Sequence, residues 1–201
     1  MSTPATHLSH QELEQGLAEA LAAPSSVGVL KAIVIRPDVG QRLKVSSARL
    51  TPEQGIEGDR WATNHWQRLP DGRPDPRSQV SLVGWRVLEL IAGEPDRLAL
   101  AGDNLILDLD VSEANLPTGS QLAIGDEVVL EITAEPHLGC QKFARRFGPQ
   151  ARAFVNSPQG KSLKLRGRYA TIVRGGTIRV GDKVSKEKVV VESTSSGRHR
   201  Q

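Results

Sequence analysis

The chain has 201 residues, 38% of them hydrophobic, which suits a single domain with a substantial core. Its formal net charge is +3, and it holds three Phe, three Trp, one Tyr and one Cys. One cysteine excludes an internal disulfide framework, and so few aromatic rings argue against a protein that stacks single-stranded nucleic acid. No apolar run approaches the roughly 20 residues that span a bilayer, so we expect no membrane partner.

An amphipathic helix is predicted over residues 8–23. Ser9 followed by Glu12 is a capping-box pattern, and Leu13, Leu17 and Leu21 recur on one face. We expect residues 1–26 to form a helical appendage that docks on the rest of the domain or on a partner. Glutamates interrupt this segment, unlike the apolar stretch of a secretory signal, so a cytoplasmic protein is expected.

Short β-type runs alternate with turn signals over the next part of the chain. The predicted strands cover residues 27–35, 43–50, 79–83, 104–109, 121–124, 128–133, 169–173 and 177–180. Gly125-Asp126 predicts a hairpin between two of them, and Arg174-Gly175-Gly176 predicts another between the last two. Helices are predicted over 84–92 and, broken at Gly148-Pro149, over about 141–156.

This pattern predicts a mainly β protein with a few short helices. Many short strands favour a closed or nearly closed β-barrel, because closure removes exposed strand edges. The barrel domain is expected over residues 27–184. Residues 185–201 are expected to form a polar, flexible tail, to which the three valines at 189–191 add at most one strand.

Cys140 is the candidate functional residue. It follows the predicted strand 128–133 and precedes a predicted helix, whose unpaired amides would lower the pKa of a thiol. The basic residues near it in sequence are Lys142, Arg145, Arg146, Arg152, Lys161, Lys164, Arg166 and Arg168. Such a thiolate can ligate a soft metal, accept a sulfur atom or attack an electrophile. The alternatives are a buried cysteine that only packs and, for His137, a loop histidine without a catalytic role.

Three further segments offer contacts to a ligand. The sequence Gly-Ile-Glu-Gly-Asp-Arg (55–60) predicts a tight loop from which Arg60 reaches an anion, or else a turn with a local ion pair. The Asn104 side chain either hydrogen-bonds backbone groups of a turn or hydrogen-bonds a ligand. Arg166 and Arg168 precede a strand, where they suit a phosphate or are simply solvated.

Taken in order, these motifs resemble the MOSC family, named for the C-terminal domain of molybdenum cofactor sulfurases. The series is Gly-Ile-Glu-Gly-Asp-Arg (55–60), Gln-Val-Ser-Leu-Val (79–83), Gly-Asp-Asn-Leu (102–105), Leu-Pro-x-Gly (116–119), Leu-x-Ile-Gly-Asp (122–126), the strand 128–133, Cys140, Arg-Gly-Arg-Tyr-Ala (166–170), Gly175-Gly176 and Val180-Gly181-Asp182. The resemblance implies a MOSC-type β-barrel over roughly residues 27–184.

The resemblance also implies roles for single residues. Cys140 would ligate the molybdenum of a pterin cofactor or carry sulfur, and Arg60, Asn104 and Arg166 would lie near the pterin phosphate or its polar edges. Two segments depart from the family pattern: residues 61–65 replace a histidine and paired glycines, and Pro-His-Leu-Gly replaces Pro-Arg-x-Pro before the cysteine. These departures leave the substrate open.

Three functions follow as hypotheses. The first is binding of a molybdenum–pterin cofactor, with reduction of N-hydroxylated compounds by electrons from an external reductase. The second is a sulfur carrier, in which Cys140 takes a persulfide sulfur from a cysteine desulfurase and delivers it to cofactor or metal–sulfur cluster assembly. The third is a non-enzymatic module whose basic patch binds nucleic acid or an acidic protein. The sequence contains no recognised nucleic-acid motif, and this counts against the third hypothesis.

Overall fold

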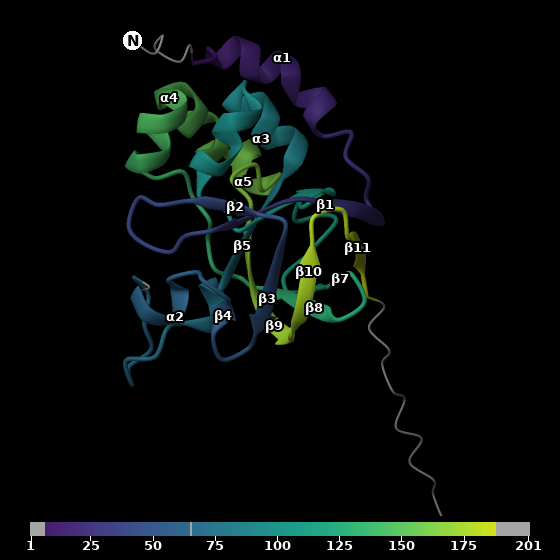
Figure 1. The fold of residues 1–201 in the computed structure, drawn as a ribbon. Helices are drawn as coiled ribbons and strands as arrows, with labels where there is room; N and C mark the ends of the chain where they lie inside the picture. Colours follow the sequence, from purple (N-terminus) through teal and green to yellow (C-terminus); the bar gives the residue numbers. More distant parts are fainter. Residues whose placement is uncertain (1–6, 65, 188–201) are drawn as a thin grey trace, which may run out of the picture.

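The computed structural model describes residues 7–64 and 66–187, and within them seven strands close into a barrel (Figure 1). The strands follow one another round the barrel in the order β1, β11, β7, β8, β9, β5 and β6, and β6 pairs back to β1. The pairing of β5 with β6 is parallel and the other pairings are antiparallel. Their bounds are β1 Val27–Ile35, β5 Val80–Gly84, β6 Leu105–Asp108, β7 Gln121–Ile124, β8 Val128–Ile132, β9 Arg168–Arg174 and β11 Lys183–Lys186. The predicted mainly β, closed-barrel fold is confirmed.

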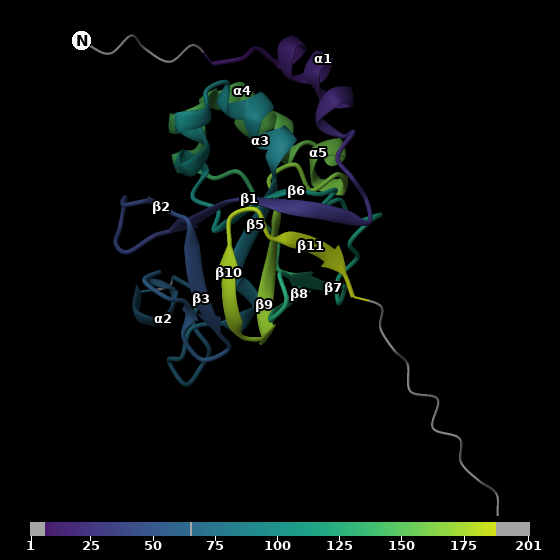
Figure 2. The ribbon, with the colours of Figure 1, turned by 45° about the vertical axis from the view of Figure 1, so that its right-hand side comes forward.

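A small second sheet lies beside the barrel. It consists of β3 (Ser47–Thr51), β4 (Gly55–Ile56) and β10 (Gly176–Arg179), in the order β10-β3-β4. The predicted strand 43–50 is divided between two sheets, because β2 (Leu43–Val45) pairs with β1 and β3 with β10. Figure 2 shows β3 and β10 side by side in front of the barrel.

The expected hairpin between residues 169–173 and 177–180 is wrong. β9 pairs with β5 and β8, whereas β10 crosses to β3. Gly175 permits this crossing, because a Cβ at that position would lie 2.5 Å from the carbonyl oxygen of Leu50. The glycines do mark a change of direction, but the strand that follows pairs with another partner.

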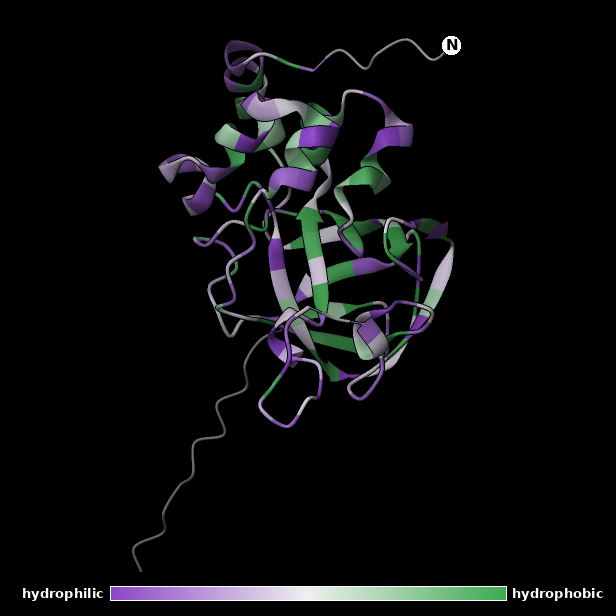
Figure 3. Cartoon of the chain, turned by 90° about the vertical axis from the view of Figure 1, so that its left-hand side faces the viewer, coloured by the Kyte–Doolittle hydropathy of each residue, from purple (hydrophilic) through white to green (hydrophobic). Residues whose placement is uncertain are grey.

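The barrel strands alternate between two hydrophobic cores. In β6, Leu105 and Leu107 point into the barrel, while Ile106 between them packs under the helices. The helical layer lies on one end of the barrel, as Figure 1 shows, and Figure 3 shows apolar residues on the helices as well as on the strands. The helices and 3₁₀ segments are α1 His10–Ala20, α2 Trp61–Asn64, η1 Pro76–Ser78, α3 Trp85–Ala92, η2 Pro95–Ala101, α4 Gln141–Asn156 and α5 Pro158–Ser162.

Helix α1 packs against the helical layer of its own chain. The predicted capping box between Ser9 and Glu12 is present. Leu13, Leu17 and Ala20 are buried in the core that α3 and α4 share. The helix therefore belongs to the hydrophobic packing of the described chain.

We predict that Leu13→Ala lowers the free energy of unfolding by about 2–5 kcal/mol, because the change leaves a cavity in a fully buried site. Leu21→Ala, at the end of the same helix where the side chain is 38% exposed, serves as the matched control and should change it by less than about 0.5 kcal/mol. Urea unfolding of both variants measures the difference. Equal stability of the two would mean that α1 does not contribute to the stability of the domain.

The predicted break at Gly148 is confirmed, since this residue leaves the helical conformation with φ +90° inside α4. Strand β11 extends to Lys186, two residues beyond the expected end of the barrel. The three valines at 189–191 and most of the expected tail lie outside the described residues. In the described part of the chain, no helix has the length and apolar character that crossing a bilayer requires.

Candidate functional site

Cys140 is exposed and occupies the N-cap of α4. Partial burial raises the pKa of its thiol, but the backbone N–H groups of Phe143 and Lys142 and the charge of Arg166 outweigh that effect and lower it overall. The sulfur thus lies at the start of a helix, although the Cys140 side chain makes no capping hydrogen bond there. This arrangement favours a thiolate over a thiol.

The sulfur opens onto a cavity of about 370 Å³, called here the Cys140 cavity. Its described lining contains seven cationic side chains and no carboxylate. They come from the β1–β2 loop, the start of α2, α4 and the segment before β9: Arg36, Arg42, Arg60, Lys142, Arg145, Arg146 and Arg166. A concave site of one sign raises the local concentration of anions.

Arg36 is held at the cavity by a buried carboxylate. Its Nε donates to Asp59 Oδ2 at 2.9 Å and its Nη2 to Asp59 Oδ1 at 3.1 Å, a bidentate pair. The Asp59 side chain is 1% exposed. The carboxylate therefore fixes the orientation of Arg36 from behind.

Arg166 is anchored in the same way by Asp103. Its Nη1 donates to Asp103 Oδ2 at 2.6 Å, and its Nη2 to the carbonyl of Ala101 at 3.2 Å. The guanidinium also lies 5.0 Å from the ring centre of Phe143. The Nε of Arg166 is buried and has no hydrogen-bond partner among the described residues.

Arg42 has no such anchor. Its Nη1 donates to the carbonyl of Gly40 at 2.9 Å, but its Nε is buried without a partner in the described part of the chain. Burial lowers the pKa of Arg42, and the charges of Arg146, Arg36 and Arg60 lower it further. Positive charge is thus concentrated around a donor that nothing in the described structure satisfies.

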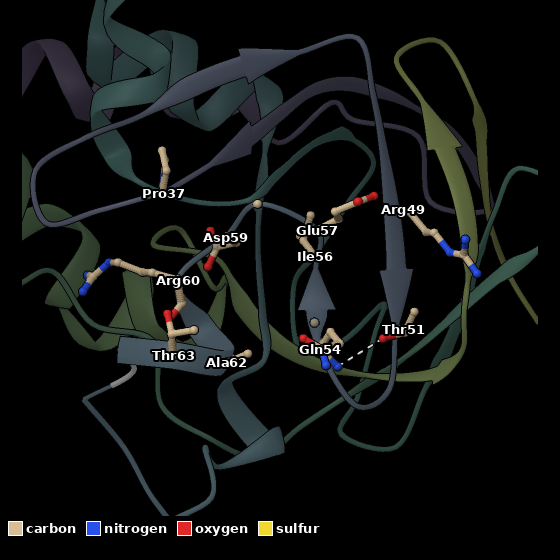
Figure 4. A pocket seen from close by; sticks show the side chains of 12 residues that line it. Pro37, Arg49, Thr51, Gln54, Ile56, Glu57, Asp59, Arg60, Ala62 and Thr63 are labelled. Carbon is tan, nitrogen blue, oxygen red and sulfur yellow. Dashed lines mark hydrogen bonds between the residues drawn. The ribbon is translucent and has the colours of Figure 1, made fainter.

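A larger cavity of about 550 Å³ shares Arg60 with the Cys140 cavity. Figure 4 shows Arg49, Thr51 and Gln54 on one side of it, with the Arg60 side chain extending away from them. The Nη1 of Arg60 donates to the carbonyl of Asn64 at 3.2 Å. Arg60 therefore stands between the two cavities.

The protein offers no metal site of its own within residues 7–64 and 66–187. No group of three or more His, Cys, Asp or Glu side chains is arranged there to hold a metal ion. At the Cys140 cavity the thiolate is the soft donor. A metal held there needs further ligands from a source other than these side chains.

A family model of the MOSC domain matches residues 76–185, which is more than half of the 201 residues. The chain belongs to the MOSC family. The matched range includes Cys140, Asn104 and Arg166, while Arg60 and the loop 55–60 lie before it. The resemblance inferred from the ordered motifs is thereby confirmed.

Solved structures support the same fold. The crystal structure of YuaD from Bacillus subtilis is similar with a TM-score of 0.58 and 20% identity, over 81% of this chain and 97% of that one. The crystal structure of a hypothetical protein gives a TM-score of 0.51 and 19% identity over 82% of this chain and 68% of that one. A comparison with curated proteins finds no match.

The MOSC fold brings three of the four expected site residues together. Cys140, Arg60 and Arg166 line one cavity although up to 106 positions separate them in the chain. Asn104 does not line it. Asn104 is fully buried. Its amide oxygen accepts a hydrogen bond from the N–H of Ser81, and its amide nitrogen donates to the carbonyl of Val34 and, at 2.9 Å, to Asp59 Oδ2.

Asn104 thus supports the site from behind, since it braces the carboxylate that holds Arg36. Its amide oxygen and nitrogen are taken up by protein groups, which explains why it does not reach the cavity. The sequence signal, an asparagine at the start of a strand, does not reveal on which side of the strand the amide points.

Sequence reasoning missed Arg36 and Arg42 in the β1–β2 loop. Pro37, Asp38 and Gly40 give that stretch a turn composition, which predicts only the end of a strand. The available signal was a pair of arginines six positions apart in a loop that follows a buried strand. Asp103, which anchors Arg166, likewise carries only a turn signal in the sequence.

His137 is buried in this MOSC domain beside the anchor of Arg166. Its Nδ1 lies 3.6 Å from Asp103 Oδ1, and its ring lies 4.3 Å from that of Tyr169, centre to centre. Desolvation lowers the pKa of His137 well below 6.5, and the charges of Arg166 and Arg36 act in the same direction. The imidazole is therefore neutral in the folded protein at neutral pH.

This burial predicts a loss of stability in mild acid. Below pH 6.5 the unfolded chain takes up a proton on His137 and the folded chain does not, so the free energy of unfolding falls by up to about 1.4 kcal/mol per pH unit. Above that pH both states are neutral at this residue and the effect vanishes. Chemical unfolding from about pH 7 to 5 should show a shallower slope for His137→Phe, which keeps a ring against Tyr169, than for the wild type.

Proposed function

We propose that this MOSC domain binds a molybdenum–pterin cofactor in the Cys140 cavity, with the Cys140 thiolate as a ligand of the metal. MOSC domains are generally associated with the molybdenum cofactor, and membership of the family supports the proposal. The observation that carries it is the cavity itself: an exposed thiol with a lowered pKa among seven cationic side chains, with no carboxylate in the described lining.

The residues present suit the anionic part of such a cofactor. A pterin phosphate offers acceptor oxygens, and arginine forks match them in geometry and charge. Arg42 and Arg166 each keep a buried Nε without a partner in the described structure. An anion in the cavity would compensate charges that the folded chain leaves unbalanced.

The metal suits the same arrangement. A lone thiolate cannot hold a metal ion by itself, and the described residues supply no ligand cluster. A pterin dithiolene brings its own sulfur ligands, so one protein thiolate is enough to complete attachment. The shortage of protein ligands therefore favours a metal that arrives inside an organic cofactor.

The proposed reaction is reduction of N-hydroxylated compounds. The bound cofactor would supply a metal centre that passes two electrons to the substrate, with the electrons coming from an external reductase. The N–OH bond then breaks, two protons are taken up, and an amine and water are released. Arg36 and Arg166, fixed by Asp59 and Asp103, would hold the anion in place, while Cys140 would fix the metal end.

Metal analysis of the purified protein tests this proposal. The chain is expressed in a host with an intact cofactor pathway and in a host that lacks it, and molybdenum per chain is measured in both. We expect close to one molybdenum per chain from the first host and none from the second. Absence of molybdenum in both preparations would overturn the proposal.

The exposure of Cys140 favours sulfur transfer as a second candidate function. In that case the thiolate attacks the persulfide of a cysteine desulfurase, and the outer sulfur passes to Cys140 as the desulfurase thiol leaves. Intact-mass analysis after incubation with desulfurase and cysteine should then show one added sulfur atom. An unchanged mass would remove this candidate.

A further inference from the structure

A smaller cavity of about 170 Å³, called here the His137 cavity, shares Arg166 with the Cys140 cavity. Its described lining contains nitrogen-bearing side chains and apolar ones but no carboxylate: Pro136, His137, Leu138, Val155, Gly160, Lys161, Lys164 and Arg166. Since a water molecule takes up roughly 30 Å³, the cavity has room for a ligand of a few heavy atoms. The proposed reaction leaves this cavity unused.

The His137 imidazole is buried but makes no hydrogen bond to any described residue. Its side chain is 7% exposed, and its Nδ1 lies 3.6 Å from Asp103 Oδ1, beyond hydrogen-bond distance. Nδ1 belongs to the fully buried side-chain atoms without a partner, whereas Nε2 does not. Nε2 is therefore the ring nitrogen that a ligand in the cavity can reach.

Asp103 decides which nitrogen of the neutral imidazole carries the proton. The carboxylate is fully buried and pairs with Arg166 at 2.6 Å. It favours the N–H on Nδ1, because a lone pair on that nitrogen would face a negatively charged oxygen. Nε2 then presents an acceptor to the cavity, so a ligand that binds it must supply a hydrogen-bond donor.

Lys161 supplies a positive charge to the same cavity. The other two cations of the lining are already paired, Lys164 with Glu113 at 2.9 Å and Arg166 with Asp103. Lys161 is exposed and forms no ion pair with a carboxylate among the described residues. It can therefore pair with an anionic group of a ligand.

The rest of the lining is apolar and suits a short carbon chain. Val155 is buried, and Leu138 is 49% exposed. An inorganic anion would leave these side chains without a contact, whereas a small organic acid would cover them. The ligand expected from this lining thus combines a donor, an anionic group and a few carbon atoms.

We propose that the His137 cavity binds a short hydroxycarboxylate. The hydroxyl donates to His137 Nε2, the carboxylate pairs with Lys161, and the carbon chain packs against Leu138 and Val155. This site is distinct from the metal-binding function proposed above and does not depend on it.

Binding of lactate and of propionate to the metal-free protein tests the inference, since the two acids share a carbon chain and differ in the hydroxyl. Histidine labelled with ¹⁵N gives a local signal, because the resonance of a ring nitrogen moves when it accepts a hydrogen bond. We expect lactate to shift the Nε2 resonance of His137. Propionate should bind about three- to tenfold more weakly, the usual effect of one hydrogen bond, and should leave that resonance nearly unmoved.

Two variants locate the ligand. Lys161→Ala should weaken lactate binding about two- to fivefold, as expected for an exposed ion pair. Lys142→Ala is the matched control, since Lys142 is also exposed and without a carboxylate partner in the described structure but lines the Cys140 cavity instead. It should leave the shift of the His137 resonance unchanged.

His137→Phe identifies the His137 resonance by its absence and should make lactate bind no better than propionate. If this variant does not fold, the comparison of the two acids on the wild type and on Lys161→Ala still decides the question.

Three results would overturn the inference. The first is a His137 resonance that stays in place at about 100 mM lactate, enough to saturate a site of roughly 1 mM affinity. The second is an equal shift with propionate, which would mean that the hydroxyl does not reach Nε2. The third is weaker binding in Lys142→Ala but not in Lys161→Ala, which would place the acid in the Cys140 cavity.

Discussion

Cys140→Ser is expected to fold like the wild type and to purify without molybdenum. The side chain is exposed and belongs to neither hydrophobic core, so its replacement should change the free energy of unfolding by less than about 0.5 kcal/mol. Serine can occupy the N-cap, but a neutral hydroxyl is a poor ligand for a soft metal. Elemental analysis, beside wild type from the same host, measures the loss.

The stability measurement is the control for this experiment. Equal unfolding curves of the two proteins show that the loss of metal is local to the sulfur. Molybdenum retained by Cys140→Ser would contradict thiolate ligation, and the cationic side chains would then have to hold the cofactor alone. A variant that lost both metal and fold would show that Cys140 has a structural role that its exposure does not suggest.

Arg166→Met is expected to lower the free energy of unfolding by about 3–5 kcal/mol, the usual effect of leaving a buried charge without its partner. The Asp103 side chain is 0% exposed and has Arg166 as its 2.6 Å partner. Its other oxygen has no hydrogen bond within the described structure and lies 3.6 Å from Nδ1 of the neutral His137, so the carboxylate would lose its cationic partner. Urea unfolding at neutral pH measures the change.

Two further variants make this prediction specific. Arg42→Met removes another cavity arginine, one that forms no ion pair with a carboxylate among the described residues. It should cost little stability or even increase it, since it relieves repulsion by Arg146, Arg36 and Arg60. Asp103→Asn combined with Arg166→Met should recover part of the loss, because the stranded charge is then absent. Equal destabilisation by Arg42→Met and Arg166→Met would mean that size, rather than charge pairing, decides the effect.

The local part of the fold was predictable from the sequence. Strand β1 has the predicted bounds 27–35, the Gly125-Asp126 hairpin joins β7 to β8, and Gly148 breaks α4. These features depend on residues close together in the chain. The partner of β10 depends instead on where β3 lies, which no turn composition encodes, and so the second predicted hairpin is wrong.

The candidate site, like the fold, could be predicted only where the signal lies in the local sequence. Cys140 and the arginines of the ordered motifs could be selected by residue type, and three of them line one cavity. No sequence motif distinguishes Arg42, because its lowered pKa arises from burial beside other cations in the folded chain.

The like charges around Cys140 affect the chain before any ligand arrives. Arg42 is repelled by Arg146, Arg36 and Arg60, so under the proposed function the folded chain without its anion would be less stable than the folded chain with the anion bound. A ligand that binds the folded state and is present at a concentration one hundred times its dissociation constant adds about 2.7 kcal/mol to the free energy of unfolding by mass action alone. If the proposed ligand binds, chains made in a cell short of it would unfold more often, and the amount of folded protein would follow the supply of that ligand.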